Sequence, residues 1–83
     1  MGRGAKLLEQ MRANPRDWRI EDVITICRAF DVTCTRPPSG SHYKVKDRSG
    51  RRMFVVPAHR PIKPVYIQLL VDFLDDLETG DED

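Results

Sequence analysis

The fold of this chain is decided by the stretch Ser39-Gly40-Ser41-His42-Tyr43-Lys44-Val45-Lys46. It opens as a turn-forming segment and then alternates polar with apolar side chains, which is the pattern of a half-buried β-strand. Because successive side chains of a strand point to opposite faces, Tyr43 and Val45 are predicted to point into the core. His42, Lys44 and Lys46 are then predicted to share the opposite face.

Two further strands are predicted beside this one. Residues 32–36 and residues 52–56 are rich in β-branched and other strand-favouring types. Pro37 and Pro38 separate the first strand from the second, because proline lacks the N–H that a strand ladder needs. The turn-forming segment 47–50 ends in a glycine, which predicts that the second and third strands form an antiparallel hairpin.

Apolar side chains at helical spacing predict helices before and after the strands. Residues 20–30 are predicted to form a helix that Asp17 caps and on which Trp18 packs. A short helix is predicted over residues 4–13, because the following Asn-Pro pair ends it.

The last predicted helix begins at Lys63-Pro64 and ends at Gly80. Its apolar stripe and that of the second helix need a common surface, which one face of a three-stranded antiparallel sheet offers. The sequence therefore predicts a single α+β domain over residues 1–83, with two main helices packed on one face of the sheet and a short N-terminal helix. The other face of the sheet is predicted to be open to water.

Charge is segregated along the chain, although the net charge is only +1. Residues 37–64 contain seven Lys or Arg and one Asp, whereas residues 65–83 contain seven Asp or Glu and no Lys or Arg. The middle of the chain is therefore predicted to face an anionic partner. The chain has no apolar run of the roughly 18–20 residues that cross a bilayer, and it does not open with a secretory signal. We expect a cytoplasmic protein with no membrane contact and no cofactor.

His42 is the candidate catalytic residue, because the predicted open face sets its imidazole beside two lysines. An imidazole can take the proton from a ribose 2′-OH that attacks the adjacent phosphate, or protonate the leaving 5′ oxygen. A nearby Lys or Arg would stabilise the charged phosphorane. This chemistry needs no metal, and residues 37–64 offer only Asp47 where a two-metal site needs several carboxylates.

Other residues of the basic segment are candidate RNA contacts, and each can alternatively be an ordinary solvated side chain. They are Gly40, Ser41, Lys44, Lys46, Arg48, Arg51, Arg52, Arg60 and Lys63. His59 is either an auxiliary acid or base or a loop residue that is hydrogen-bonded locally. Tyr43 is interpreted as a core residue, with base stacking as the alternative. Cys27 and Cys34 are interpreted as core residues in a reducing compartment and not as a disulfide or zinc site, because they lack CxxC spacing and further ligands.

Four motifs occur together in the strands and the last helix. They are Gly40-Ser41-His42, Ser49-Gly50-Arg51-Arg52, Val56-Pro57-Ala58-His59 and Ile62-Lys63-Pro64-Val65-Tyr66-Ile67. With this combination the chain resembles, over residues 15–77, the HicA toxins of bacterial type II toxin-antitoxin systems. The resemblance implies a fold similar to the double-stranded RNA-binding domain (dsRBD-like), endoribonuclease activity on mRNA (an mRNA interferase) with His42 as the catalytic histidine, and neutralisation by a HicB-type antitoxin.

The resemblance leaves residues 1–14 as an N-terminal extension and residues 78–83 as an acidic tail. The chain also departs from many relatives at Phe30-Asp31-Val32, where they have a glycine followed by an aromatic residue. Because His42 is predicted to lie on a surface, an antitoxin is expected to cover it directly. The sequence is also consistent with two other hypotheses. One is an RNA-binding module of the same fold that does not cleave, and the other is a protein-interaction domain whose basic face binds an acidic partner.

Overall fold

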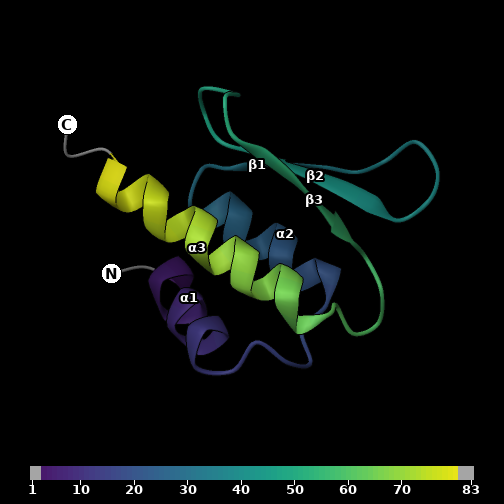
Figure 1. Cartoon of the computed structure of the whole chain (residues 1–83), viewed down its shortest axis with the longest axis horizontal. Helices are drawn as coiled ribbons and strands as arrows, with labels where there is room; N and C mark the ends of the chain where they lie inside the picture. The colour runs from purple at the N-terminus through teal and green to yellow at the C-terminus, as the bar shows by residue number, and fades with distance from the viewer. Residues whose placement is uncertain (1–2, 81–83) are drawn as a thin grey trace.

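The computed structural model describes residues 3–80 and, for side chains, residues 4–77. Its elements are α1 (Arg3–Ala13), α2 (Ile20–Ala29), β1 (Thr33–Thr35), β2 (His42–Lys46), β3 (Met53–Pro57) and α3 (Pro64–Gly80). The predicted order of helices and strands is confirmed, and the fold is a small α+β arrangement (Figure 1). Residues 81–83, which belong to the predicted acidic tail, lie outside the described residues. None of the described helices is long and apolar enough to cross a membrane.

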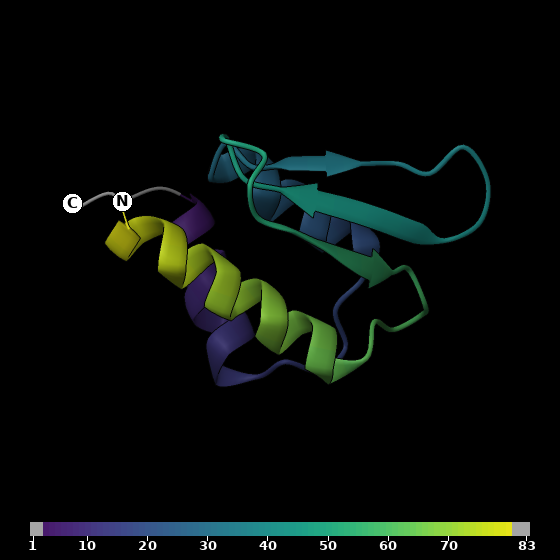
Figure 2. The ribbon, with the colours of Figure 1, turned by 45° about the horizontal axis from the view of Figure 1, so that its top comes forward.

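The three strands form one antiparallel sheet in the order β1-β2-β3. β2 therefore lies in the centre, with β1 and β3 as the two edges. The predicted hairpin is confirmed, because β2 and β3 pair from His42 opposite Pro57 to Lys46 opposite Met53. All three helices lie on the same side of the sheet, and the other side carries no element of the described chain (Figure 2).

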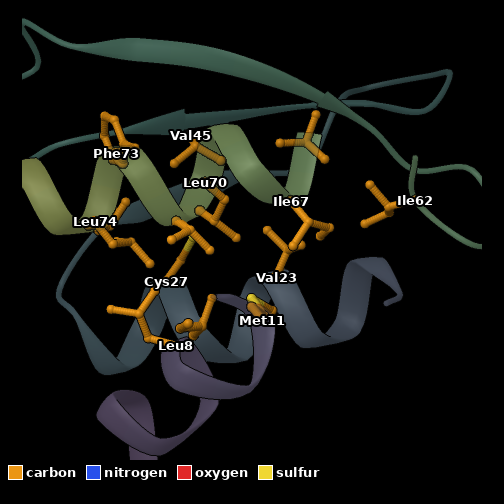
Figure 3. Close-up of a cluster of buried hydrophobic side chains, with 14 residues drawn as sticks. Leu8, Met11, Val23, Cys27, Val45, Ile62, Ile67, Leu70, Phe73 and Leu74 are labelled. Atoms are coloured by element: carbon orange, nitrogen blue, oxygen red, sulfur yellow. The ribbon is translucent and has the colours of Figure 1, made fainter. Parts of the chain in front are cut away.

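A single apolar cluster holds the helices to the sheet (Figure 3). β2 contributes Val45, which has no exposed surface, and α3 contributes Ile67 and Leu70, which are equally covered. Trp18 and Cys34 are partly buried against the same cluster, as predicted for core-packed residues. The hydrophobic effect of this burial positions the sheet, because the side chains that its central strand turns toward the helices are apolar.

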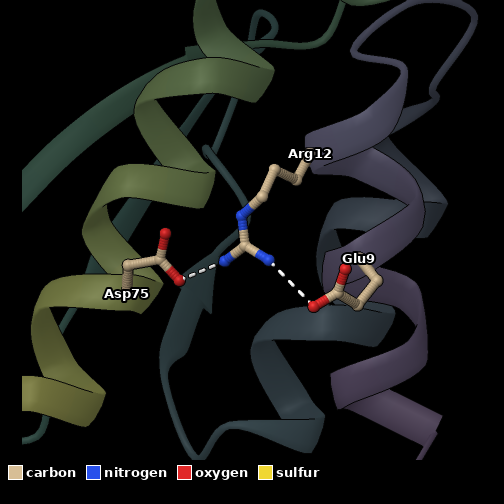
Figure 4. A network of polar contacts seen from close by, with 3 residues as sticks. All are labelled: Glu9, Arg12 and Asp75. Carbon is tan, nitrogen blue, oxygen red and sulfur yellow. Dashed lines mark hydrogen bonds and ion pairs between the residues drawn. The ribbon is translucent and has the colours of Figure 1, made fainter.

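Helix α1 is part of this core. Leu8 and Met11 are buried in the cluster, at 4% and 0% exposure. Gly4 allows the start of α1 to approach α2 closely, since a Cβ at this position would lie 2.7 Å from the Cβ of Ala29. The side chain of Arg12 bridges Glu9 in α1 and Asp75 in α3 (Figure 4). The segment set apart as an N-terminal extension therefore supplies both apolar and ionic contacts to the rest of the fold.

The predicted cap of α2 is wrong. Asp17 has a positive φ of 67° and precedes the helix by too far to cap it. The N-cap position is taken by Arg19, whose backbone N–H donates to the carboxylate of Asp22 at 3.0 Å. Trp18 lies outside the helix. The carbonyl oxygen of Trp18 accepts a hydrogen bond from the N–H of Ile62 at 2.9 Å, which holds the residues before Arg19 in a non-helical conformation. That tertiary bond could not be seen in the local sequence.

Helix α2 ends in a Schellman motif centred on Asp31. The N–H of Val32 donates to the carbonyl of Cys27 at 2.8 Å, and the N–H of Asp31 donates to that of Arg28 at 3.2 Å. This motif requires a left-handed residue at Asp31, where φ is 60°. Glycine is the residue that adopts this conformation without steric cost, so the aspartate found here carries a small steric cost.

Replacing Asp31 by glycine is expected to raise the free energy of unfolding by about 0.5–1 kcal/mol, because it removes the steric cost of a left-handed L-residue. Asp31→Ala is the matched control and is expected to lower the free energy of unfolding, since alanine tolerates the left-handed region less well than aspartate. Urea unfolding of the three proteins measures both changes. Equal stability of the glycine and alanine variants would show that backbone conformation at this position is not limiting.

Candidate nucleic-acid interface

The open face of the sheet, opposite the helices, carries the predicted row of polar side chains on β2. His42, Lys44 and Lys46 are exposed, whereas the intervening Tyr43 and Val45 are buried. The predicted alternation is therefore confirmed, and so is the assignment of Tyr43 to the core. Because β2 is the central strand, His42, Lys44 and Lys46 lie along the middle of the sheet face that no element of the described chain covers.

Strand register places two further rows beside the β2 row, and sequence reasoning missed both. Lys46 lies between Thr33 of β1 and Met53 of β3, and Lys44 lies between Thr35 and Val55. All four of these neighbours are exposed. The open face is thus built of a hydroxyl row, a cationic row that begins with His42, and an apolar row. The two-residue alternation also applies to the flanking strands, but it predicts these two rows only when the register between the strands is known.

The His42 end of the sheet gathers two loops. Residues 36–41 lead into β2, and residues 58–63 leave β3 at the same end (Figure 2). The two loops are joined by a hydrogen bond from the N–H of Ala58 to the carbonyl of Ser41, at 2.7 Å. Gly40 has φ of 85° and nothing within 4 Å of where a Cβ would stand, so the backbone before His42 is open to close approach.

Several predicted site residues lie at this same end. The backbone of His59 follows two residues after Pro57, the cross-strand partner of His42. His59, Arg60 and Lys63 are all exposed in the loop that leads to α3. The structure therefore brings these three residues to the His42 end of the sheet.

The remaining arginines lie at the other end, around the β2–β3 turn. Lys46, which precedes that turn, is four residues from His42, a separation of about 13 Å along a strand. Arg48 and Arg51 are exposed there. A ligand can contact these arginines and His42 at the same time only if it extends along the whole open face.

Arg52 is placed differently from the other predicted contacts. Its guanidinium donates to Asp76 of α3 at 2.8 Å and lies 5.6 Å from the ring centroid of Phe73. Phe54, the next residue of the same phase on β3, also stacks edge-on against Phe73, with ring centroids 5.2 Å apart. Arg52 therefore holds the hairpin to α3 on the helix side of the sheet. It does not lie beside Lys44 and Lys46, which form the lysine row of β2 on the open face.

Asp47 organises the turn that separates β2 from β3. Its carboxylate accepts hydrogen bonds from the Ser49 hydroxyl at 2.9 Å and from the Gly50 N–H at 2.7 Å. Burial alone would raise the pKa of Asp47, but these bonds and those from the neighbouring backbone N–H groups outweigh it and lower the pKa below its ordinary value of 3.8. The one carboxylate of the basic segment is therefore used to shape the turn.

Because the pKa of Asp47 is lower in the folded chain than in the unfolded chain, its contribution to stability is present above the ordinary value of 3.8 and is lost as the pH falls through the folded value. We expect the melting temperature to fall as the pH is lowered from about 5 to 3. Asp47→Asn removes this titration, so its melting temperature is expected to fall less over the same range. Parallel profiles for the two proteins, measured by circular dichroism, would contradict this assignment.

Cys27 and Cys34 lie next to each other where α2 meets β1, and both are free thiols. A hydrogen bond with Cys34, together with burial, raises the pKa of the Cys27 thiol. The same bond lowers the pKa of the Cys34 thiol, although partial burial opposes it. Within the described part of the chain, no group of three His, Cys, Asp or Glu side chains could hold a metal ion.

Comparison of the chain with protein-family models, with curated proteins and with solved structures finds no match.

Proposed function

We propose that the chain is a toxin of the HicA type, with a dsRBD-like fold, that cleaves mRNA without a metal ion. The observation that supports this most strongly is the row of His42, Lys44 and Lys46, all exposed on the central strand of an uncovered sheet face. An extended polyanion can lie along such a row, with its phosphates beside the ammonium groups and one ribose beside the imidazole. The Gly-Ser-His, Val-Pro-x-His and last-helix motifs are the second line of support.

The proposed reaction is an intramolecular transfer at phosphorus. The ribose 2′ oxygen forms a bond to the adjacent phosphorus as the bond to the 5′ oxygen breaks, which leaves a 2′,3′-cyclic phosphate and a 5′-hydroxyl. His42 either accepts the 2′-OH proton, with water protonating the 5′ oxygen, or protonates the 5′ oxygen, with water accepting the 2′-OH proton; an imidazole can act as base or acid. Lys44, the next exposed residue of the row, is positioned to stabilise charge on the phosphorane.

This mechanism is tested with the purified chain and matched substrates. We expect RNA to be cleaved to 2′,3′-cyclic phosphate ends, in the presence of EDTA as well as in its absence. An oligonucleotide with a single 2′-deoxy substitution at the cleavage site is expected to bind and resist cleavage there, since it lacks the nucleophile. Cleavage that EDTA abolishes, or that proceeds at the 2′-deoxy position, would refute the proposal.

A non-catalytic RNA-binding module is the second candidate. It is favoured by one observation: the row itself carries a single imidazole, since His59 lies on a loop and not on the sheet. In this case RNA binds with the steep salt dependence of phosphate contacts, and no cyclic phosphate forms at any protein concentration. A protein-interaction domain would instead show little or no affinity for RNA at moderate salt.

The exposed row also supports a proposal about inhibition. A HicB-type antitoxin would neutralise the toxin by covering His42 directly, because nothing in the described chain shields this face. Hydrogen exchange of the toxin alone and with the product of the adjacent reading frame tests this. Protection is expected on β2 and in the loops at its His42 end, and full inhibition with protection confined to α1 and α3 would refute direct occlusion.

A further inference from the structure

We propose that the open face binds single-stranded RNA in one orientation, with the phosphates along the lysine row of β2 and the bases on the apolar side chains of Met53 and Val55. This inference rests on the proposed function and assigns its substrate class. It starts from the strand register, which sets Lys46 directly beside Met53 and Lys44 directly beside Val55. Each cation therefore has one apolar partner on the next strand.

The spacing of this array suits a nucleic-acid strand that runs parallel to β2. Lys44 and Lys46 are two residues apart, about 6.6–6.8 Å, a step comparable to that between consecutive phosphates of an extended single strand. The neighbouring strand is about 4.8 Å away, so a base attached to a ribose above the lysine row reaches the apolar row. Two consecutive nucleotides can in this way engage two cation and apolar pairs at once.

The apolar row is exposed on the open face. Met53 is 50% exposed and Val55 is 37% exposed, and they are two of the four large apolar side chains that the described chain leaves in water. The other two, Val65 and Leu69, belong to α3, and Leu69 lines a surface hollow together with Met53 at the β3 edge. Covering apolar surface with the flat face of a base removes it from water, which favours binding without reading the base sequence.

The hydroxyl row on the other side of the lysines completes the arrangement. Thr33 pairs with Lys46, and Thr35 pairs with Lys44. Threonine hydroxyls donate hydrogen bonds to phosphate oxygens and to ribose. The backbone of the ligand is thus flanked by hydroxyl donors on the β1 side and by an apolar platform on the β3 side, which gives the bases one direction in which to point.

A duplex would not use this platform. In double-stranded RNA the bases are stacked on each other, and proteins contact it through phosphates and 2′-hydroxyls. Met53 and Val55 would then remain uncovered against a charged backbone. The lysine row alone would bind single and double strands by charge, whereas the apolar row favours a strand whose bases are free.

The experiment measures the affinity of a fluorescent RNA of about 12 nucleotides, either single-stranded or annealed to its complement, in a His42→Gln background that prevents cleavage. We expect the single strand to bind at least about 10-fold more tightly than the duplex. The double variant Met53→Ser/Val55→Thr is expected to weaken single-strand binding about 10-fold, in line with the loss of base contacts. Its affinity for the duplex and its salt dependence are expected to stay unchanged.

Val65→Ser is the control, because Val65 is an apolar side chain of comparable exposure on α3, outside the proposed site. It is expected to leave both affinities unchanged. Val55→Lys is a second, independent test that replaces the apolar side chain on the edge strand by a cation. If the site binds by charge alone, this variant tightens binding of both RNAs; if bases rest on β3, it weakens the single strand while tightening the duplex.

Equal affinity for single and double strands, or an unaffected Met53→Ser/Val55→Thr variant, would overturn the assignment of the apolar row. The proposed function would survive this result if the protein with His42 intact still cleaves RNA. A chain that neither binds nor cleaves RNA at low salt would overturn both, and it would assign the face to a protein partner. Circular dichroism melting of each variant shows that a loss of affinity is not a loss of folding.

Discussion

Replacing His42 by alanine is expected to lower the rate of RNA cleavage about 10²–10⁴-fold, the range that general acid–base catalysis contributes. The imidazole is exposed and makes none of the side-chain hydrogen bonds or ion pairs found among the described residues, so its removal does not disturb the packing beneath it. RNA affinity is expected to change by less than about 3-fold, because the lysine row and the rest of the open face remain. Single-turnover cleavage and fluorescence anisotropy measure the two effects separately.

Two controls make this result specific. His59→Ala changes the other histidine at the same end of the sheet and is expected to reduce cleavage much less, since His59 lies on a loop outside the lysine row. Lys44→Ala is expected to weaken binding and to reduce the salt dependence of affinity by about one phosphate contact. Full activity of the His42→Ala variant, or an equal loss for both histidine variants, would contradict the role assigned to His42.

Replacing Met11 by alanine is expected to lower the free energy of unfolding by about 2–5 kcal/mol, the range for truncating a large buried side chain. Met11 has no exposed surface and belongs to the apolar cluster that α1 shares with α2 and α3. A domain of this size has a total stability of roughly 4–12 kcal/mol, so the loss would leave a chain near its unfolding threshold. Urea unfolding at neutral pH measures the change.

Gln10→Ala provides the control, because Gln10 is exposed on the same helix. It is expected to change stability by less than about 0.5 kcal/mol. If Met11→Ala costs as little as this control, α1 contributes little to the stability of the core. A large loss confined to Met11 would instead make residues 1–14 an integral part of the domain.

The face of each side chain on β2 was predictable because it depends on a local rule. The two-residue period of a strand separates His42 from Tyr43 whatever the strand pairs with. The Schellman motif at the end of α2 is also local, but the sequence does not reveal it, because its left-handed position is occupied by Asp31 and not by glycine. The cap of the same helix was mispredicted because Trp18 is held by Ile62, which is distant in sequence.

Residues with the same charge acquired different roles only in the folded chain. Arg51 and Arg52 are neighbours in the sequence, yet Arg51 is exposed at the turn and Arg52 is paired with Asp76 on α3. Composition alone treats both as phosphate contacts. The apolar Met53 and Val55 were assigned to a strand by their type, but their place beside the lysines follows from the β2–β3 register.

The sequence by itself determined the order of the elements, the strand hairpin and the outward direction of His42, because periodicity and turn chemistry act over a few residues. Only the tertiary structure decided that α1 is buried in the core, that two loops meet at the His42 end, and that hydroxyl, cationic and apolar rows lie side by side on the open face. Those features depend on pairing between segments that are far apart in the chain, and no local pattern encodes which partner each segment meets.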